Sequence, residues 1–277
     1  MGNGTRTKLA AHRNLTGFWL FAAGLSMAIC AACFLLAAGA AQNNPSRDAL
    51  WQIVNKMCVP EQTQNHDPKP CVQVDLQEGS GRGFALLKDL RGETQFLLIP
   101  TARISGIESP LILAPDAENY FADAWESRTY VNDALHRTLP PDDIGLAVNS
   151  AASRSQDQLH IHIDCVRADV LNVLHKNEAA IGSHWAPVGP LPFGHRYMAM
   201  WVPGEQLSSS NPFRLLAEGL PGARQDMGDH TLVLIGFTRS DGAKGFVLLE
   251  GQVDRDRDLA AGEELLDHAC RIGRAGQ

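Results

Sequence analysis

Apolar and polar residues alternate strictly from residue 158 to residue 165, in the stretch "QLHIHIDC". A period of two predicts a β-strand whose successive side chains point to opposite faces. One predicted face carries Leu159, Ile161, Ile163 and Cys165, and the other carries Gln158, His160, His162 and Asp164. Four neighbouring polar groups are costly to bury. The polar face therefore either holds a functional site or is exposed to water.

The longest apolar run extends from residue 17 to residue 41 and contains no charged residue. A helix of this length exceeds the roughly 30 Å hydrocarbon core of a bilayer. Arg6, Lys8 and Arg13 precede it, so the positive-inside rule predicts a cytoplasmic N-terminus and an exported remainder. A cleaved signal peptide is the alternative, because "AGAAQ" offers small residues at its end. The chain then begins with a cytoplasmic N-terminus (1–16), a transmembrane anchor (17–41) and a linker (42–50).

The next segment, residues 51–182, has the pattern of a catalytic α+β domain. After an opening helix near residue 51, two strands joined by a short turn predict a hairpin. A helix that starts with Asp116 as its N-cap and two further strands follow. The predicted strands span residues 83–90, 94–101, 144–150 and 158–166, and the helix spans 116–136. This order predicts an antiparallel sheet with packed helices.

The remaining residues, 183–277, predict a C-terminal α+β extension, after a helix over 167–182. Its predicted elements are a strand (197–203), a helix (211–220), a hairpin (230–237 and 245–252) and a final helix (257–273). The extension repeats the strand–helix–strand–strand order without the His-x-His pattern. A degenerate duplication and a merely similar pattern both remain open.

Composition agrees with an exported globular protein. The 277-residue chain is 44% hydrophobic and 20% charged, with a formal net charge of −7, so nothing points to a nucleic-acid partner. Oligomeric state is not indicated.

Four of the six cysteines follow the apolar run, and an oxidising compartment would permit them to form disulfides. Cys58 and Cys71 flank a predicted loop that a local bridge could close. Cys165 points away from the histidines, so a bridge to Cys270 would fasten the C-terminus behind the strand. Four cysteines allow three pairings, and free buried thiols are the alternative.

Three roles are open for His160 and His162. They could bind a metal, but a catalytic site usually needs a third protein ligand, and no spacing selects His195, His230 or Asp164 for it. They could be ordinary hydrogen-bonded strand residues. They could also catalyse phosphoryl transfer, because a neutral imidazole can attack phosphorus and form a phosphoramidate. The other ring nitrogen must then be held as N–H by an acceptor.

The segments "ALLKDLRGETQFLLIPTARI", "AVNS" and "SQDQLHIHID" favour the third role. Together, across roughly residues 83–166, they resemble the histidine-triad superfamily of nucleotide hydrolases and transferases, whose motif is His-φ-His-φ-His-φ-φ with φ apolar. With the anchor, the segment between Cys58 and Cys71 and the C-terminal half, the whole chain resembles the family of bacterial CDP-diacylglycerol pyrophosphatases.

The resemblance implies a role for each matching residue. His160 takes the position of the nucleophile, and His162 that of a phosphate contact. Gln158 stands where the superfamily usually has its first histidine, so the chain departs from the motif at this supporting position. Asp89 matches a ribose-binding position, and Asn149 and Ser155 match polar positions near the phosphates.

The resemblance also implies a reaction, with no cofactor and no metal. The substrate would be CDP-diacylglycerol in the bilayer, cleaved to CMP and phosphatidate through a cytidylyl-histidine. The enzyme would be a single-pass protein of a bacterial inner membrane with a periplasmic catalytic domain. The alternatives are a hydrolase of soluble nucleoside diphosphate derivatives and a non-enzymatic metal- or nucleotide-binding module.

Overall fold

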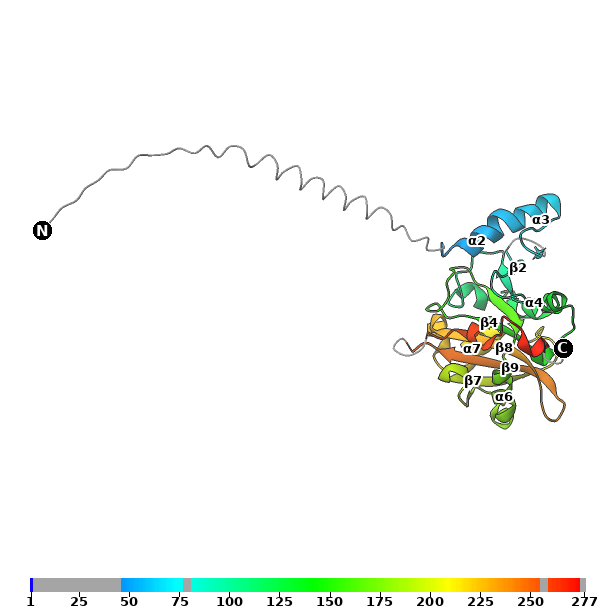
Figure 1. Cartoon of the computed structure of the whole chain (residues 1–277), viewed down its shortest axis with the longest axis vertical. Coiled ribbons are helices and arrows are strands. Elements are labelled where there is room, and N and C mark those ends of the chain that lie inside the picture. The colour runs from blue at the N-terminus through cyan, green and yellow to red at the C-terminus, as the bar shows by residue number, and fades with distance from the viewer. Residues whose placement is uncertain (2–45, 77–80, 255–258, 275–277) are drawn as a thin grey trace. The chain divides into compact units, whose positions relative to one another are not determined.

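A large antiparallel sheet lies at the centre of the computed structural model, which describes Met1 and residues 46–76, 81–254 and 259–274 (Figure 1). Within these residues the sheet has nine strands in the order β1-β2-β3-β5-β4-β8-β9-β7-β6. The strands are β1 (Gln73–Asp75), β2 (Phe84–Lys88), β3 (Phe96–Pro100), β4 (Ile144–Val148), β5 (Ile161–Cys165), β6 (Ala186–Val188), β7 (Tyr197–Pro203), β8 (His230–Thr238) and β9 (Lys244–Gln252). The α+β class and the antiparallel sheet are confirmed.

Helices cover both faces of the sheet. The α-helices are α2 (Ala49–Ile53), α3 (Val59–Asn65), α4 (Tyr120–Glu126), α5 (Thr129–Leu135), α6 (Ala168–Lys176), α7 (Pro212–Gly219), α8 (Ala223–Asp226) and α9 (Arg271–Arg274), with a π-helical turn, η1 (Val54–Cys58), between α2 and α3. Short 3-10 helices are η2 (Pro110–Leu113), η3 (Pro141–Asp143), η4 (Glu178–Ala180), η5 (Pro192–Gly194), η6 (Met227–Asp229) and η7 (Gly262–Leu265). In Figure 1, α2 and α3 lie beside β2, and α6 lies at the opposite end of the sheet.

Both predicted segments contribute strands to the same sheet, and the described residues from 46 onward form one compact unit. β4 pairs with β8 at the centre. From there the order is β4-β5-β3-β2 on one side and β8-β9-β7-β6 on the other. A duplicated strand–strand–helix–strand–strand unit would produce this matching order, so duplication stays our hypothesis. The edge strands β1 and β6 are each three residues long, too short to show a periodic pattern in the sequence.

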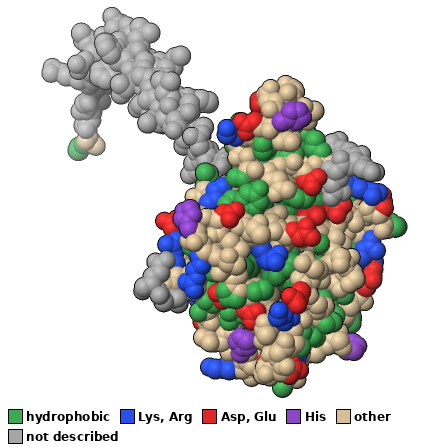
Figure 2. All heavy atoms as spheres, turned by 90° about the vertical axis from the view of Figure 1, so that its right-hand side faces the viewer, with side chains coloured by type: hydrophobic (Ala, Val, Ile, Leu, Met, Phe, Trp, Pro, Cys, Tyr) green, Lys and Arg blue, Asp and Glu red, His purple; other side chains and the backbone are tan. Residues whose placement is uncertain are grey.

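The two faces of β5 are used differently, as its alternation predicts. The strand begins at Ile161, so the first three residues of the strand predicted over 158–166, including His160, directly precede it. Leu159, Ile161, Ile163 and Cys165 belong to the main hydrophobic core, together with side chains from α4, α5 and α7. A second core lies on the other side of the sheet and includes Val170 and Leu174 of α6. On the face shown in Figure 2, acidic and basic side chains are interspersed among apolar ones, so neither sign of charge dominates that surface.

Both predicted disulfides, Cys58–Cys71 and Cys165–Cys270, are present. The predicted loop between Cys58 and Cys71 is wrong in its first half, because α3 continues to Asn65. Pro60 lies in the first turn of α3, directly after the π-helical turn η1. His66, in the left-handed conformation, ends the helix.

The predicted start of the helix over 116–136 is also wrong. Asn119, not Asp116, precedes the first turn of α4. The Asn119 side chain donates hydrogen bonds to the carbonyls of Leu207 and Ser210, which fixes this start against the chain before α7. Asp116 instead forms an exposed ion pair with Arg82 at 2.6 Å.

The final helix predicted over 257–273 is replaced by η7, a single β-bridge and α9. Leu266 forms the bridge with Val166, and Cys270 is bonded to Cys165. Tertiary contacts at both positions hold this segment across the end of β5. These contacts outweigh the preference for a helix that the spacing of its apolar residues indicates.

The predicted N-terminus, anchor and most of the linker lie outside the described residues. The described chain resumes at residue 46, and α2 begins at Ala49, two residues before the predicted start of the catalytic domain. None of the helices within residues 46–76, 81–254 and 259–274 combines the length and hydropathy needed to cross a bilayer.

Candidate active site

The polar face of β5 is buried. His160 is 7% exposed and His162 4%, while Gln158 and Asp164 are fully buried. Burying four polar side chains is tolerable only when they are hydrogen-bonded. The face therefore carries a polar network, and its partners identify the chemistry available to it.

The hydrogen bond of His160 fixes which of its ring nitrogens can react. Nδ1 lies 2.7 Å from the carbonyl oxygen of Gln158. A carbonyl only accepts, so Nδ1 carries the proton and Nε2 keeps its lone pair. Burial lowers the pKa of His160. The imidazole is thus neutral, with Nε2 available as a nucleophile.

His162 has the opposite arrangement. Its Nδ1 lies 3.1 Å from Nε2 of Gln95, and the same Gln95 nitrogen donates to Asp89. Because the bond to Asp89 identifies that atom as the amide nitrogen, Nδ1 of His162 accepts and Nε2 carries the proton. Burial lowers the pKa of His162 to about 4, so the ring is neutral. Its Nε2–H is buried without a hydrogen-bond partner.

Asp89, the predicted ribose contact, is linked to the histidines through Gln95. One carboxylate oxygen accepts from Gln95, and the other accepts from the backbone N–H of Arg91 at 3.2 Å. Asp89 therefore orients the amide that sets the tautomer of His162. Its contact with ribose remains a prediction.

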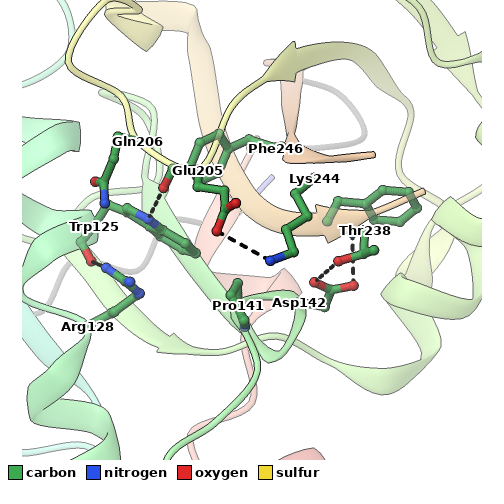
Figure 3. A pocket seen from close by; sticks show the side chains of 11 residues that line it. Trp125, Arg128, Pro141, Asp142, Glu205, Gln206, Thr238, Lys244 and Phe246 are labelled. Atoms are coloured by element: carbon green, nitrogen blue, oxygen red, sulfur yellow. Dashed lines mark hydrogen bonds and ion pairs between the residues drawn. The ribbon is translucent and has the colours of Figure 1, made fainter. Parts of the chain in front are cut away.

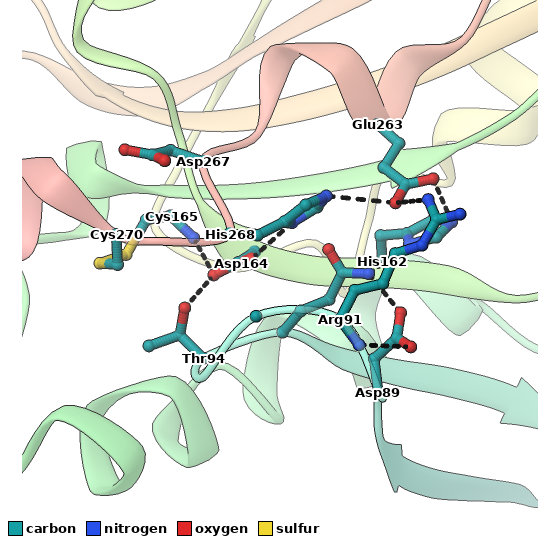
Figure 4. Close-up of polar contacts among 12 residues, drawn as sticks. Asp89, Arg91, Thr94, His162, Asp164, Cys165, Glu263, Asp267, His268 and Cys270 are labelled. Carbon is teal, nitrogen blue, oxygen red and sulfur yellow. Dashed lines mark hydrogen bonds and ion pairs between the residues drawn. A yellow bond between two sulfur atoms is a disulfide. The ribbon is translucent and has the colours of Figure 1, made fainter.

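A carboxylate from the C-terminal segment faces His162 (Figure 4). One oxygen of Glu263 lies 3.5 Å from Nε2 of His162 and 3.2 Å from the amide nitrogen of Asn149. The other lies 3.2 Å from Nε2 of His268 and 3.6 Å from Arg91. Burial opposes ionisation of Glu263, but the hydrogen bond from His268 and the nearby charges lower its pKa overall. Glu263 is an anion.

His268 lies between two carboxylates. Its Nδ1 donates to Asp164 at 3.0 Å, and its Nε2 faces Glu263. These two hydrogen bonds raise the pKa of His268 to about 9, so it is a cation at neutral pH. Asp164 also accepts from Thr94 at 2.6 Å and from the backbone N–H of Cys165 at 2.8 Å. Burial raises the pKa of Asp164, although these hydrogen bonds act in the opposite direction.

The other predicted residues have different surroundings. Gln158, in place of the first histidine, donates to the carbonyls of Pro100 and Ala102 at 3.0 and 2.8 Å, and its own backbone oxygen orients His160. Ser155 is exposed and does not line the cleft at His160. The structure thus brings Asn149 and Gln158, but not Ser155, to the histidines.

The cleft at His160 is narrow, with an empty volume of about 170 Å³. Its lining comprises Gly106, Val148, Asn149, Arg154, Gln158, Leu159 and His160. Arg154, which the sequence pattern does not single out, is held there by Glu108 at 2.5 and 3.0 Å.

The three side chains considered as a third metal ligand are engaged elsewhere. His195 contacts Glu264 at 2.5 Å, and His230 lies between Glu250 and Asp226. Asp164 is bound by His268. In the described part of the chain, no three or more His, Cys, Asp or Glu side chains form a potential metal-binding group.

A larger cavity, of about 490 Å³, lies beside Trp125 and the β8–β9 hairpin (Figure 3). Its polar side chains bind one another: Lys244 faces Glu205 at 3.4 Å, and Asp142 accepts from Thr238 at 2.9 Å. None of the polar residues of β5 lines it. The reactive groups are therefore confined to the narrow cleft and the network around it.

An antiparallel sheet bearing a buried, neutral histidine with a free Nε2 defines an α+β protein equipped for nucleophilic chemistry. Comparison with known proteins gives the family. The model of the CDP-diacylglycerol pyrophosphatase family matches residues 45–274, and the chain belongs to this family of hydrolases. It is 40% identical over 226 residues to the CDP-diacylglycerol pyrophosphatase of Yersinia pestis, a match that covers 81% of this chain and 84% of that protein.

Proposed function

We propose that the protein hydrolyses CDP-diacylglycerol to CMP and phosphatidate through a covalent intermediate on His160. Family membership supports the substrate. The observation that carries the mechanism is the 2.7 Å hydrogen bond from Nδ1 of His160 to the Gln158 carbonyl. It leaves the lone pair on Nε2, as a histidine nucleophile requires.

In the first step, Nε2 of His160 attacks the phosphorus of the CMP moiety. A P–N bond forms, and the P–O bond to the bridging oxygen breaks, so that phosphatidate departs with that oxygen and its electron pair. The Nε2–H of His162 can donate to a phosphate oxygen, because it makes no hydrogen bond with any of the described residues. Donors aimed at developing negative charge lower the barrier.

In the second step, water attacks the same phosphorus. The water oxygen stays on CMP, the P–N bond breaks, and the electron pair returns to Nε2 of His160. The protons of the attacking water pass to solvent and phosphate. His160 is regenerated in its neutral form, which its lowered pKa favours.

We also propose that residues 17–41 anchor the enzyme in a bacterial inner membrane with the catalytic unit in the periplasm. The charge-free run and the preceding basic residues support this topology. Two disulfides fit an oxidising compartment. A substrate whose acyl chains stay in the bilayer also favours an enzyme held at the membrane surface.

The test is turnover of radiolabelled CDP-diacylglycerol by the purified protein. The wild type should give CMP and phosphatidate in equal amounts and should leave soluble nucleoside diphosphate sugars largely intact. His160→Ala should lower kcat by about 10⁴-fold or more, because alanine offers no nucleophile. His184→Ala, at an exposed histidine, is the matched control and should retain wild-type activity. Near-normal turnover by His160→Ala would rule out the covalent mechanism.

A further inference from the structure

Four nitrogen groups from separate parts of the chain converge on Glu263. They belong to Arg91 after β2, Asn149 after β4, His162 on β5 and His268 near the C-terminus. Two of these groups are cations and two are neutral N–H donors. Such a set is suited to an anion with several oxygens, and a phosphate fits this description better than one carboxylate does.

The carboxylate of Glu263 satisfies this set incompletely. His162 Nε2–H is 3.5 Å away and remains without a hydrogen bond, and Arg91 is 3.6 Å away. A phosphate group has more oxygens and a wider spread of acceptor directions than a carboxylate. These N–H donors therefore remain available to hydrogen-bond an anion larger than a carboxylate.

Glu263 also lies against His162 within the buried polar network. His160 and His162 are 7% and 4% exposed, and the cleft at His160 is narrow. Glu263 carries a negative charge 3.5 Å from Nε2 of His162, and this charge would repel a phosphate bound at that nitrogen.

We propose that Glu263 is a resident anion that occupies the phosphate site of the ligand-free enzyme, and that substrate phosphate displaces it onto Arg91, His268, Asn149 and His162. This inference rests on the proposed function, which it deepens by assigning phosphate ligands and a competing group. Arg91 and His268 thereby become substrate-binding residues.

The displacement requires movement of a side chain alone. The backbone is fixed by a hydrogen bond from Gly262 N–H to Thr231 at 2.7 Å and by one from Glu263 N–H to Asn149 at 3.1 Å. The side chain of Glu263 is 17% exposed, so a rotation about its own bonds can carry the carboxylate toward water. The Cys165–Cys270 disulfide keeps His268 beside β5 during this change.

The experiment measures the dissociation constant of CMP, and of inorganic phosphate as its competitor, by calorimetry. Glu263→Gln removes the competing charge and should tighten binding of both by about tenfold or more. Glu264→Gln is the matched control on the same short helix, because Glu264 contacts His195 and Tyr197 instead. It should change both constants by less than about twofold. Unchanged or weaker binding by a folded Glu263→Gln protein would overturn the proposal.

A second measurement needs no variant. In a crystal structure of the wild-type protein with CMP, the phosphate should contact Asn149 and His162, and Glu263 should have left both. Glu263 retained on these residues beside bound CMP would overturn the proposal. Neither experiment depends on turnover, so the two proposals can fail separately. If Glu263→Gln tightens phosphate binding but the wild-type protein does not cleave CDP-diacylglycerol, the proposed substrate is refuted and the proposed role of Glu263 stands.

Discussion

At the scale of single residues, two adjacent histidines receive opposite tautomers from the groups bonded to Nδ1. The Gln158 carbonyl accepts from Nδ1–H of His160 and keeps the proton on that nitrogen, whereas the Gln95 amide donates to Nδ1 of His162 and leaves it unprotonated. One ring consequently offers a lone pair and the other an N–H. These two contacts support the proposed roles of His160 as nucleophile and His162 as hydrogen-bond donor.

The lowered pKa of His160 makes a prediction for the pH dependence of catalysis. An ordinary histidine is half protonated near pH 6.5 and then loses its lone pair. Because burial lowers the pKa of His160, the nucleophile should stay neutral below that pH. The plot of log(kcat/KM) against pH should therefore stay level down to about pH 6.5. The pH at which kcat/KM falls to half on the acidic side should lie below that value. An acidic midpoint at or above 6.5 would contradict the assigned environment of His160.

The residues of the site differ in how far the sequence could predict them. The histidine pair was predictable because alternation is a local pattern, and it assigns each side chain to a face. Gln95 and His268 were not, because they lie 67 and 104 residues from the groups they bind. The only signal near His268 was the predicted bridge at Cys270, which already brought this segment to β5.

At the scale of elements, the C-terminal segment shows how a disulfide can serve an active site. Cys165 points into the hydrophobic core, while Asp164 beside it faces the histidine side. Cys270 forms the disulfide with Cys165, and His268 donates a hydrogen bond to Asp164. The C-terminal segment therefore contacts both faces of β5 at the end of the strand. The bridge thus fixes a cation of the polar network as well as the fold.

Removing this bridge should therefore affect both stability and activity. Cys165→Ala/Cys270→Ala opens a loop of 105 residues and should cost about 4–5 kcal/mol of unfolding free energy. It should also lower kcat/KM, because His268 loses its attachment. Cys58→Ala/Cys71→Ala, with a 13-residue separation, is the control and should cost about 3 kcal/mol without this loss.

Denaturant unfolding and steady-state kinetics on the two double variants provide the measurement. Equal kcat/KM for folded Cys165→Ala/Cys270→Ala and wild-type protein would show that the bridge has no part in the site.

At the scale of the whole molecule, the sequence predicted the hairpins and the order of the elements but not their union in one sheet. The β2–β3 and β8–β9 hairpins have local turn signals. The β4–β8 pairing joins strands more than 80 residues apart, for example Val148 with Leu232, and depends on how the two halves pack. No periodic pattern within either half contains that information.

The proposed membrane topology predicts the behaviour of fusion proteins. Alkaline phosphatase fused after residue 50 should be active, because alkaline phosphatase must be exported to form its own disulfides. A green fluorescent protein fused at the same point should be exported and dark. The basic residues before the apolar run give the physical reason. Fluorescence without phosphatase activity would place the catalytic unit in the cytoplasm.

The covalent intermediate can be detected directly by acid-free rapid quenching of wild-type protein with CDP-diacylglycerol, followed by mass spectrometry of its peptides. We expect a cytidylyl group on the peptide that contains His160, with fragmentation assigning it to that residue and not to His162. His162→Ala is the companion sample and should carry the group on the same residue. A cytidylyl group on another residue, or turnover with no adduct at any quench time, would rule out His160 as the nucleophile.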